Sequence, residues 1–253
     1  MRKLETVDRA LLVLQSFTQP GQTLTVTMLV EALGVHRSSA SRLAGTLAER
    51  GFLERAADSE AFRLGPAAVR LGRLALASRD IAVDARGAMT QLAHKTGETA
   101  VLSILQGTEA LDIVQVDGPH LVGTRKWAGR LAPLHASSDG KIFLAFCDID
   151  VNDVQLSALT MRTITGADEL QTELEIVRCR GWAVATGELE EGLRGVAVPV
   201  RDDFDRCIAA LSVSGPEYRI SDESIPKIVE LLQIAASEIS VKLGYMIRRE
   251  SMN

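Results

Sequence analysis

Two short patterns in the sequence are of the kind found around a catalytic serine. Residues 138–141 read Ser-Asp-Gly-Lys, which fits S-x-x-K, and residues 95–97 read Lys-Thr-Gly. In penicillin-recognising serine hydrolases these patterns supply a nucleophilic serine with its lysine and, further along the chain, a K-T-G segment. Here K-T-G comes first, and four-letter patterns with two free positions recur by chance. An enzyme that uses Ser138 and Lys141 is therefore kept as the alternative interpretation.

The same stretch predicts a binding site for a polar ligand. A loop followed by a helix start places free backbone N–H groups beside the hydroxyls of Ser137 and Ser138, where they can bind a carboxylate or another polar group. The alternative is that one of these serines only caps its own helix. On a predicted strand at 207–215, Ser212 and Ser214 alternate with apolar residues, so both hydroxyls face the same way, into a pocket or into water.

Metal, cofactor and disulfide chemistry are not indicated. The sequence contains no G-x-S-x-G, P-loop or G-x-G-x-x-G pattern, and its four histidines are scattered. The three cysteines, at positions 147, 179 and 207, are widely spaced and have no histidine at metal-binding spacing. The sequence therefore predicts reduced thiols, no metal and no cofactor.

Arginines and small hydroxyl residues gather at the start of a predicted helix near residues 38–50. Ala40, Leu43 and Leu47 form its inner face, and the outward residues at its start are Arg37, Ser38, Ser39, Ser41 and Arg42. Short hydroxyls let a helix lie deep in the major groove, and arginine can bind guanine through two hydrogen bonds. This pattern predicts a DNA-recognition helix. The alternative is an ordinary helical hairpin with a solvated face.

The elements around this helix favour DNA binding. Val26, Leu29, Val30 and Leu33 are spaced as one face of a helix, which Gly34 ends. A further helix is predicted at 7–17, and residues 51–65 read as a strand, a polar tip at 57–60 and a second strand. Three helices followed by a β-ribbon predict a winged helix-turn-helix over residues 1–65. Arg55 and Arg63 flank the tip and are predicted to touch the DNA backbone or the minor groove.

The rest of the chain predicts a second domain built on a sheet. After a linker helix at residues 66–82, residues 83–253 alternate irregularly between helices and hairpins. The expected elements are helices at 85–95, 140–146, 167–180 and 222 to about 248, hairpins at 99–118 and 195–215, and one short strand among the loops of 119–136. Hairpin-length links favour an antiparallel sheet, and therefore an α+β fold, over a doubly wound parallel sheet.

Composition indicates folded domains without a strongly basic field. The 253 residues are 46% hydrophobic and 24% charged, with a net charge of -5. Residues 1–65 hold 8 Lys/Arg against 7 Asp/Glu, and the remainder holds 20 against 26. DNA affinity must therefore come from local placement of arginines and from dimerisation. No signal-peptide-like run or apolar stretch of about 20 residues is present, so we expect a cytoplasmic protein without membrane contact.

Four ordered blocks of sequence carry a family resemblance. They are HRSSASRLAGTLAERGFLER with FRLG after it, LAPLHASSDGKIFLA, RGWAVATGELEEGLRGVAVPVRD and ALSVSGPEYRI. Along nearly its whole length the chain resembles the isocitrate-lyase-regulator (IclR) family of bacterial transcription factors. The resemblance implies a winged helix-turn-helix, a linker helix and a C-terminal effector domain related to GAF and profilin-like sheets. It also implies homodimers or homotetramers that bind operator DNA under control of a small, often carboxylated or aromatic, metabolite.

The resemblance also implies where the effector binds. The family's pocket lies between the LHASSDGK loop, the GELEEG region and the SVSG strand, which here nominates Ala132, Ser138, Asp139, Gly195, Ser212 and Ser214. Asp139 stands where relatives usually carry a small residue, and Ala185-Thr186 replaces a common acidic pair. A carboxylate at Asp139 would repel an anionic ligand, increasingly so as the pocket excludes water. Our hypothesis is a neutral or amine-bearing effector.

The predicted function is that of a ligand-responsive, homo-oligomeric transcriptional regulator, acting as repressor or activator of a catabolic operon. Its dimers would bind a pseudo-palindromic operator with half-sites about 34 Å, or a multiple of that, apart. Two rivals stay open: an enzyme with a regulatory N-terminal domain, and a winged helix used for protein contacts beside a sensor domain.

Overall fold

The structure is a computed structural model that describes residues 4–19, 21–57, 59–77, 80–120 and 126–243. The chain divides into two compact units, Met1–Ser78 and Arg79–Asn253. Each unit has its own hydrophobic core. In the described part of the chain, no helix is both long enough and apolar enough to cross a membrane.

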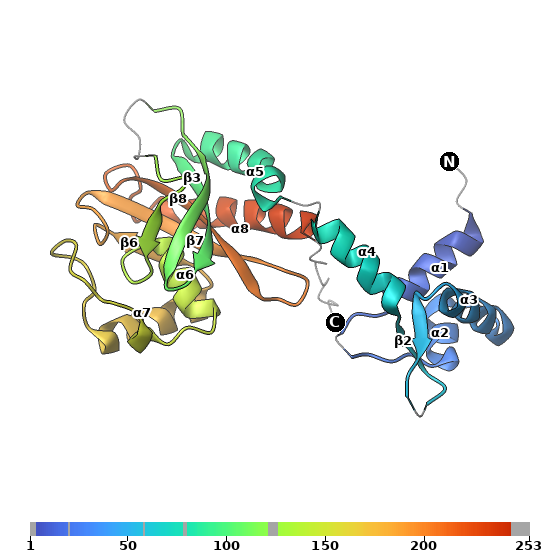
Figure 1. Ribbon diagram of the computed structural model, residues 1–253. Coiled ribbons are helices and arrows are strands. Elements are labelled where there is room, and N and C mark those ends of the chain that lie inside the picture. Colours follow the sequence, from blue (N-terminus) through green and yellow to red (C-terminus); the bar gives the residue numbers. More distant parts are fainter. Residues whose placement is uncertain (1–3, 20, 58, 78–79, 121–125, 244–253) are drawn as a thin grey trace. The chain divides into compact units, whose positions relative to one another are not determined.

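The first unit has the predicted order of helices and ribbon (Figure 1). Its elements are α1 (Glu5–Gln15), α2 (Val26–Leu33), α3 (Arg37–Glu49), β1 (Leu53–Arg55), β2 (Phe62–Leu64) and α4 (Pro66–Ala77). The Thr25 hydroxyl caps α2 by accepting from the Met28 N–H at 3.3 Å. Gly34 ends α2 in the left-handed conformation, with φ at 62°, as its position in the sequence predicted. The helix-turn-helix and the antiparallel wing are thus confirmed.

Small residues of α3 form the centre of this unit. Ala40 and Ala44 are fully buried against Val13 of α1 and Leu29 of α2. The wing strands close the cluster through Leu53 and Phe62. Because alanine lets helices approach closely, α3 is held by one narrow face and its opposite face stays exposed.

The predicted linker helix is interrupted. The period of apolar residues predicted one helix at 67–82, whereas α4 ends at Ala77 and α5 (Ile81–Thr96) begins a new helix. Asp80 starts α5 as its cap, with the Asp80 carboxylate accepting from the Ala82 N–H at 2.9 Å. The prediction failed because periodicity alone does not detect a capping carboxylate, whose hydrogen bond favours a new helix start. Residues 78–79 lie outside the described residues.

The second unit contains a six-stranded antiparallel sheet in the order β5-β4-β3-β8-β7-β6. Its strands are β3 (Thr99–Gln106), β4 (Glu109–Val116), β5 (Leu131–Pro133), β6 (Ala183–Thr186), β7 (Leu193–Arg201) and β8 (Cys207–Pro216). Both predicted hairpins are confirmed, as are the α+β class and the antiparallel sheet. The edge strand β6 was not predicted.

Helices cover both faces of this sheet (Figure 1). On one face lie α5 and α8 (Ile225–Lys242), and on the other α6 (Ser138–Phe146) and α7 (Ala167–Arg180), with a short 3-10 turn at Val151–Asp153. Large residues of β7 such as Val196 and Val198 pack toward α5 and α8. The alternating position Ala197 belongs to the α6 side. The small residues on that side leave space between α6 and the sheet.

Candidate functional site

The first turn of α6 is pressed against the chain that leads into it. Ser137 is its cap: the Ser137 hydroxyl accepts from the Gly140 N–H at 3.1 Å and donates to the Pro133 carbonyl at 3.0 Å. A Cβ on Gly140 would lie 2.3 Å from the Cα and oxygen of Leu134, so only glycine fits there. Of the two roles considered for Ser137, helix capping is the one that the structure shows. Ser138 and Asp139 follow as the first helical residues.

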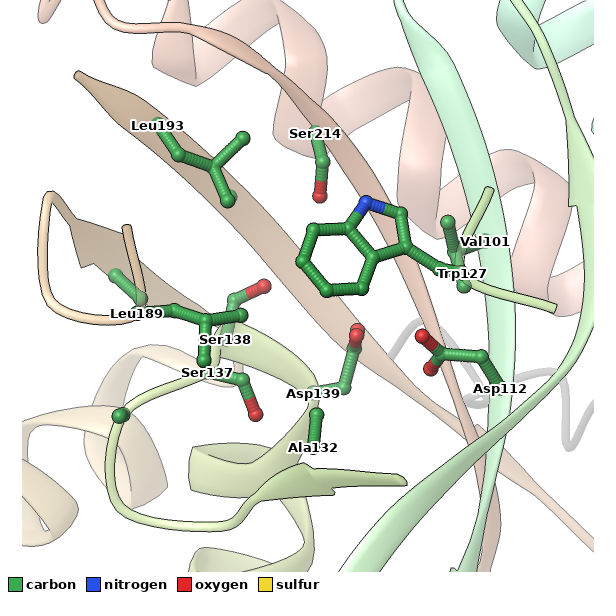
Figure 2. A pocket seen from close by; sticks show the side chains of 13 residues that line it. Val101, Asp112, Trp127, Ala132, Ser137, Ser138, Asp139, Leu189, Leu193 and Ser214 are labelled. Carbon is green, nitrogen blue, oxygen red and sulfur yellow. The ribbon is translucent and has the colours of Figure 1, made fainter. Parts of the chain in front are cut away.

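A cavity lies between this helix start and the sheet (Figure 2). The space not filled by atoms amounts to about 450 Å³, part of it open to solvent. Five of the six residues nominated from the sequence line it: Ala132, Ser138, Asp139, Gly195 and Ser214. The sixth, Ser212, is fully buried and is not among the lining residues. The other lining residues were not nominated from the sequence as effector contacts, among them Val101, Asp112, Trp127, Leu189 and Leu193.

Gly195 lets the start of α6 approach β7 beside the cavity. A Cβ at this position would lie 2.7 Å from the Ser138 hydroxyl and 3.4 Å from the Ser214 hydroxyl. The absence of a side chain therefore lets Ser138, at the start of α6, lie close to the sheet at this position.

A β-bulge brings Asp112 into the cavity. Leu102 of β3 pairs with Val114 of β4, but the next residue, Ser103, pairs with Asp112, which leaves Ile113 as the extra residue. Strict alternation would place Asp112 and Val114 on the same face. Instead Val114 packs in the cluster under α5 and α8, and Asp112 lies on the face toward α6.

Two buried carboxyl groups meet in the cavity. Asp139 is 8% exposed and Asp112 is 4% exposed. The Ser103 hydroxyl donates to Asp112 Oδ1 at 2.7 Å. Burial raises the pKa of Asp112 to about 6 despite this hydrogen bond. Burial together with the Asp112 charge raises the pKa of Asp139 to about 8, although the hydroxyls of Ser212 and Ser103 act to lower it.

These pKa values predict that the second unit loses stability as pH rises from about 4 to about 8. In the unfolded chain both carboxyls lose their protons near 3.8, whereas the folded state holds them up to about 6 and about 8. The folded state thus binds more protons over this interval, and the free energy of unfolding falls as pH rises.

Asp139→Asn removes the larger part of this effect. We expect the variant to unfold at a higher temperature than the parent at pH 8 and to show a smaller change between pH 5 and pH 8. Thermal unfolding followed by tryptophan fluorescence measures both, because Trp127 and Trp182, the two tryptophans of the chain, belong to the second unit. If the pH dependence of stability were unchanged in Asp139→Asn, Asp139 would not be the group that causes it.

A buried lysine ties the helix start to the opposite wall. Lys141 is 1% exposed, and its ammonium donates to Glu188 Oε1 at 2.7 Å and to the Val184 carbonyl at 3.0 Å. Glu173 Oε1 lies 3.7 Å from the same nitrogen. Burial raises the pKa of Glu188, and the Lys141 charge acts against this rise. Glu188 precedes Leu189 of the cavity wall, so this ion pair positions that wall.

The residues predicted to contact DNA lie on α3 and the wing. Ser39 is half-buried, and the other six are exposed: Arg37, Ser38, Ser41, Arg42, Arg55 and Arg63. The Arg37 guanidinium donates to the Thr27 hydroxyl at 3.4 Å.

Both wing arginines also have contacts within the wing. The Arg55 guanidinium donates to the Glu60 carbonyl at 3.2 Å and lies over the Phe62 ring, 5.1 Å from its centroid. Arg63 forms an ion pair with Glu54 across the two strands, with Nε 2.8 Å from Oε1. Of the two, Arg63 has its charge paired with a carboxylate.

Two domain families match these two units. The IclR helix-turn-helix domain matches residues 6–57, and the C-terminal domain of the bacterial transcriptional regulator IclR matches residues 73–241. The chain belongs to the IclR family. This membership confirms the resemblance seen in the sequence and makes the chain a ligand-responsive, DNA-binding transcriptional regulator with a helix-turn-helix and an effector-binding domain.

IclR-family relatives match over most of their length. The HTH-type transcriptional regulator XynR of Escherichia coli (strain K12) is 32% identical over 96% of this chain and 98% of its own. The HTH-type transcriptional regulator KdgR of the same organism is 33% identical over 87% of this chain and 86% of its own. The crystal structure of a putative IclR transcriptional regulator from Silicibacter sp. TM1040 superposes with a TM-score of 0.85 at 27% identity, covering 95% of this chain and 96% of that one. These relatives are regulators, and the enzyme alternative finds no support among them.

Proposed function

We propose that this IclR-family regulator acts in the bacterial cytoplasm and controls a catabolic operon by binding a pseudo-palindromic operator through α3. The proposal depends on one observation, that one unit has an exposed helix face suited to DNA and the other has a polar cavity. One unit exposes arginines and serines on the free face of α3, and the other encloses polar groups in a cavity. An output surface and an input site on one chain are what a ligand-controlled regulator requires.

The packing of α3 supports the choice of DNA contacts. Ala40 and Ala44 are buried, so Ser38, Ser41 and Arg42 lie on the face directed away from the core. Exposed hydroxyls can bind phosphates or base edges, and Arg42 can form two hydrogen bonds with guanine. We assign base contacts to this face, with Arg37 and Ser39 beside it, and backbone or minor-groove contacts to Arg55 and Arg63.

Assembly as a homodimer or homotetramer completes the proposal. A two-fold dimer presents two copies of α3, and its operator then has two half-sites about 34 Å, or a multiple of that, apart. Doubling the contacts supplies the affinity that a nearly neutral DNA-binding unit lacks on its own.

The experiment that tests the proposal measures binding to DNA from upstream of the chain's own gene at several salt concentrations. Cationic side chains that bind DNA phosphates release the counterions held there. Added salt opposes this release, so the logarithm of the binding constant falls steeply and linearly with the logarithm of salt concentration. We expect such a slope, and tighter binding than to a random fragment of equal length. A salt-independent or absent interaction would favour a winged helix that contacts protein.

The Glu54–Arg63 ion pair leads to a prediction about the wing. Glu54→Gln removes a carboxylate next to DNA and frees Arg63 for a phosphate, so we expect operator affinity to rise about twofold to fivefold at low salt. Fluorescence anisotropy with a labelled operator measures the change, and Glu109→Gln in the second unit is the control of equal charge. A loss of affinity in Glu54→Gln would show that the ion pair serves to orient Arg63 for DNA.

We further propose that the chain has no hydrolase activity. Lys141 is engaged by Glu188 and by the Val184 carbonyl, which gives its ammonium a structural role. Esterase and amidase turnover is expected to be absent in both the parent and Ser138→Ala. Turnover that is present in the parent chain and absent in Ser138→Ala would support the enzyme alternative.

The cavity is proposed as the effector site. Its residues include the five nominated lining residues, with Ser212 beneath them as a buried hydroxyl close to Asp139.

A further inference from the structure

We propose that the effector is a small organic cation whose ammonium group sits between the carboxyl groups of Asp112 and Asp139 and against the indole ring of Trp127. The inference rests on the proposed function, because it names the chemical class of the ligand that the regulator senses. It turns the expectation of a neutral or amine-bearing effector into a defined set of contacts.

The two carboxyl groups come from opposite walls of the cavity. Asp112 projects from the bulge in β4, and Asp139 projects from the first turn of α6. Figure 2 shows both carboxyl groups directed into the space beneath the indole ring of Trp127. Both act on one another electrostatically, since the Asp112 charge contributes to the behaviour of Asp139. A cation placed between them would be attracted by both.

Asp139 has bonding capacity that the protein does not use. Its Oδ1 is buried and meets no donor among the described residues in hydrogen-bond geometry, although the hydroxyls of Ser212 and Ser103 lie near the carboxyl group. A buried polar atom without a partner is costly, and a ligand that donates a hydrogen bond to it removes that cost. An ammonium group is such a donor.

The start of α6 does not favour an anion. A helix N-terminus carries partial positive charge and attracts anions, but an aspartate in the first turn compensates that charge once it has lost its proton. Asp139 stands in this turn. Among the described residues that line the cavity there are two aspartates and no lysine, arginine or histidine. Two cations near the cavity are directed elsewhere, because Lys141 donates to Glu188, and Arg194 donates to Ile220 and pairs with Asp222.

Trp127 is fixed next to Asp112 by the backbone. The Trp127 N–H donates to Gln115 Oε1 at 2.6 Å, and the Trp127 carbonyl accepts from the Arg130 N–H at 2.8 Å. Within the same turn, the Gly129 N–H donates to the Asp112 carbonyl at 2.7 Å. These bonds hold the backbone of Trp127 beside Asp112, and its indole ring lies above the two carboxyl groups (Figure 2), where its face can bind a cation.

The rest of the lining sets the shape of the organic part. Val101, Leu189 and Leu193 provide apolar walls, and Ser138 and Ser214 provide hydroxyls near Gly195. This lining suits a short alkyl or aromatic group, and the two hydroxyls can bind one polar substituent.

The carboxyl groups predict how binding depends on pH. Asp112 is the charged group that faces Asp139, together with the hydroxyls of Ser103 and Ser212. With a pKa of about 8, Asp139 keeps its proton in the empty cavity at neutral pH, and an ammonium ligand displaces this proton. Affinity for an ammonium should therefore rise between pH 6 and pH 8.5. A carboxylate ligand would need the protonated acid and should bind more weakly as pH rises.

The test compares probes of equal length and different charge on the full chain. Isothermal titration measures n-butylammonium, butan-1-ol and butyrate, with benzylammonium, benzyl alcohol and benzoate as a second set. We expect at least tenfold tighter binding of one ammonium than of its alcohol and its carboxylate. Titrations in two buffers of different ionisation enthalpy should show proton release at pH 7. Trp182→Phe leaves Trp127 as the single tryptophan, and its emission should change on ammonium binding.

Matched variants assign the contacts. Asp139→Asn and Asp112→Asn should each weaken ammonium binding at least tenfold, and Asp139→Asn should abolish most of the proton release. Asp148→Asn, at an exposed position of the same unit, is the control and should leave affinity unchanged. Thermal unfolding of each variant verifies that it is folded.

Three results would overturn the inference: no saturable binding of either ammonium at 10 mM, tighter binding of a carboxylate, or unchanged ammonium affinity in Asp139→Asn. Binding to upstream DNA is measured in parallel. Release of DNA on addition of a carboxylate would contradict a cationic effector but would agree with the proposed function as a ligand-controlled regulator. Ammonium binding by a chain that does not bind DNA would support a cationic ligand and contradict the proposed function.

Discussion

Replacing Lys141 with alanine is expected to lower the free energy of unfolding of the second unit by about 3–5 kcal/mol. Lys141 is 1% exposed and lies 2.7 Å from the carboxylate of Glu188, which is itself buried. Removing the cation leaves that carboxylate without its partner and creates a cavity at the base of α6. Because Glu188 can then take up a proton, the loss should be smaller at pH 5 than at pH 8.

Denaturant unfolding followed by tryptophan fluorescence measures this loss, since Trp127 and Trp182 both report on the second unit. Lys227→Ala, at an exposed position of α8, is the matched control and should change stability by less than about 0.5 kcal/mol. The double variant Lys141→Met/Glu188→Gln removes both charges and should recover more than half of the loss. A loss below about 1 kcal/mol in Lys141→Ala would show that the ion pair is not a major source of stability.

Replacing Arg42 with alanine is expected to weaken operator binding by a factor of about 30 or more. One pair of hydrogen bonds between arginine and guanine contributes roughly 1–3 kcal/mol of discrimination, and a dimer carries the contact twice. Arg42 is exposed on the face of α3 opposite Ala40 and Ala44, where this contact is available.

Gel shifts at one fixed salt concentration measure the effect of Arg42→Ala. Arg86→Ala, at an exposed position of α5, removes the same charge from the other unit and should leave operator affinity unchanged within about twofold. Arg42→Lys keeps the charge but loses the planar fork, so it should retain general DNA affinity and lose preference for the operator. Equal affinities of Arg42→Ala and the parent chain would remove Arg42 from the set of DNA contacts.

The DNA-binding unit could be predicted from sequence because its signals are local. Val26 to Leu33 follow one helical face, Gly34 ends the helix in a conformation that favours glycine, and the wing alternates around a polar tip. Each signal lies within a few residues of the element that it defines. The break between α4 and α5 was missed because it depends on a cap at Asp80, which does not disturb the apolar period.

The cavity could be predicted only in part. Its residues on α6, β7 and β8 belong to recognisable sequence blocks, whereas Asp112 belongs to none and reaches the cavity through a bulge that breaks strand alternation. Trp127 was expected only in an irregular loop, and its position depends on hydrogen bonds to Gln115 and Arg130. Nothing in the spacing of residues 138–141 shows that Lys141 pairs with Glu188, 47 residues further along the chain. Contacts of this kind arise from tertiary structure, and single-sequence patterns do not encode them.

The most direct test of the central claim, that this chain is a sequence-specific DNA-binding regulator, is selection from sheared genomic DNA of its own organism. The parent chain and Arg42→Ala are each incubated with the fragments at physiological salt, and the bound DNA is sequenced. We expect the parent to enrich a few intergenic segments that share a pseudo-palindrome with half-sites one helical turn or a multiple apart, and Arg42→Ala to lose this enrichment. Recovery of fragments in proportion to their abundance, equal for both proteins, would contradict the claim.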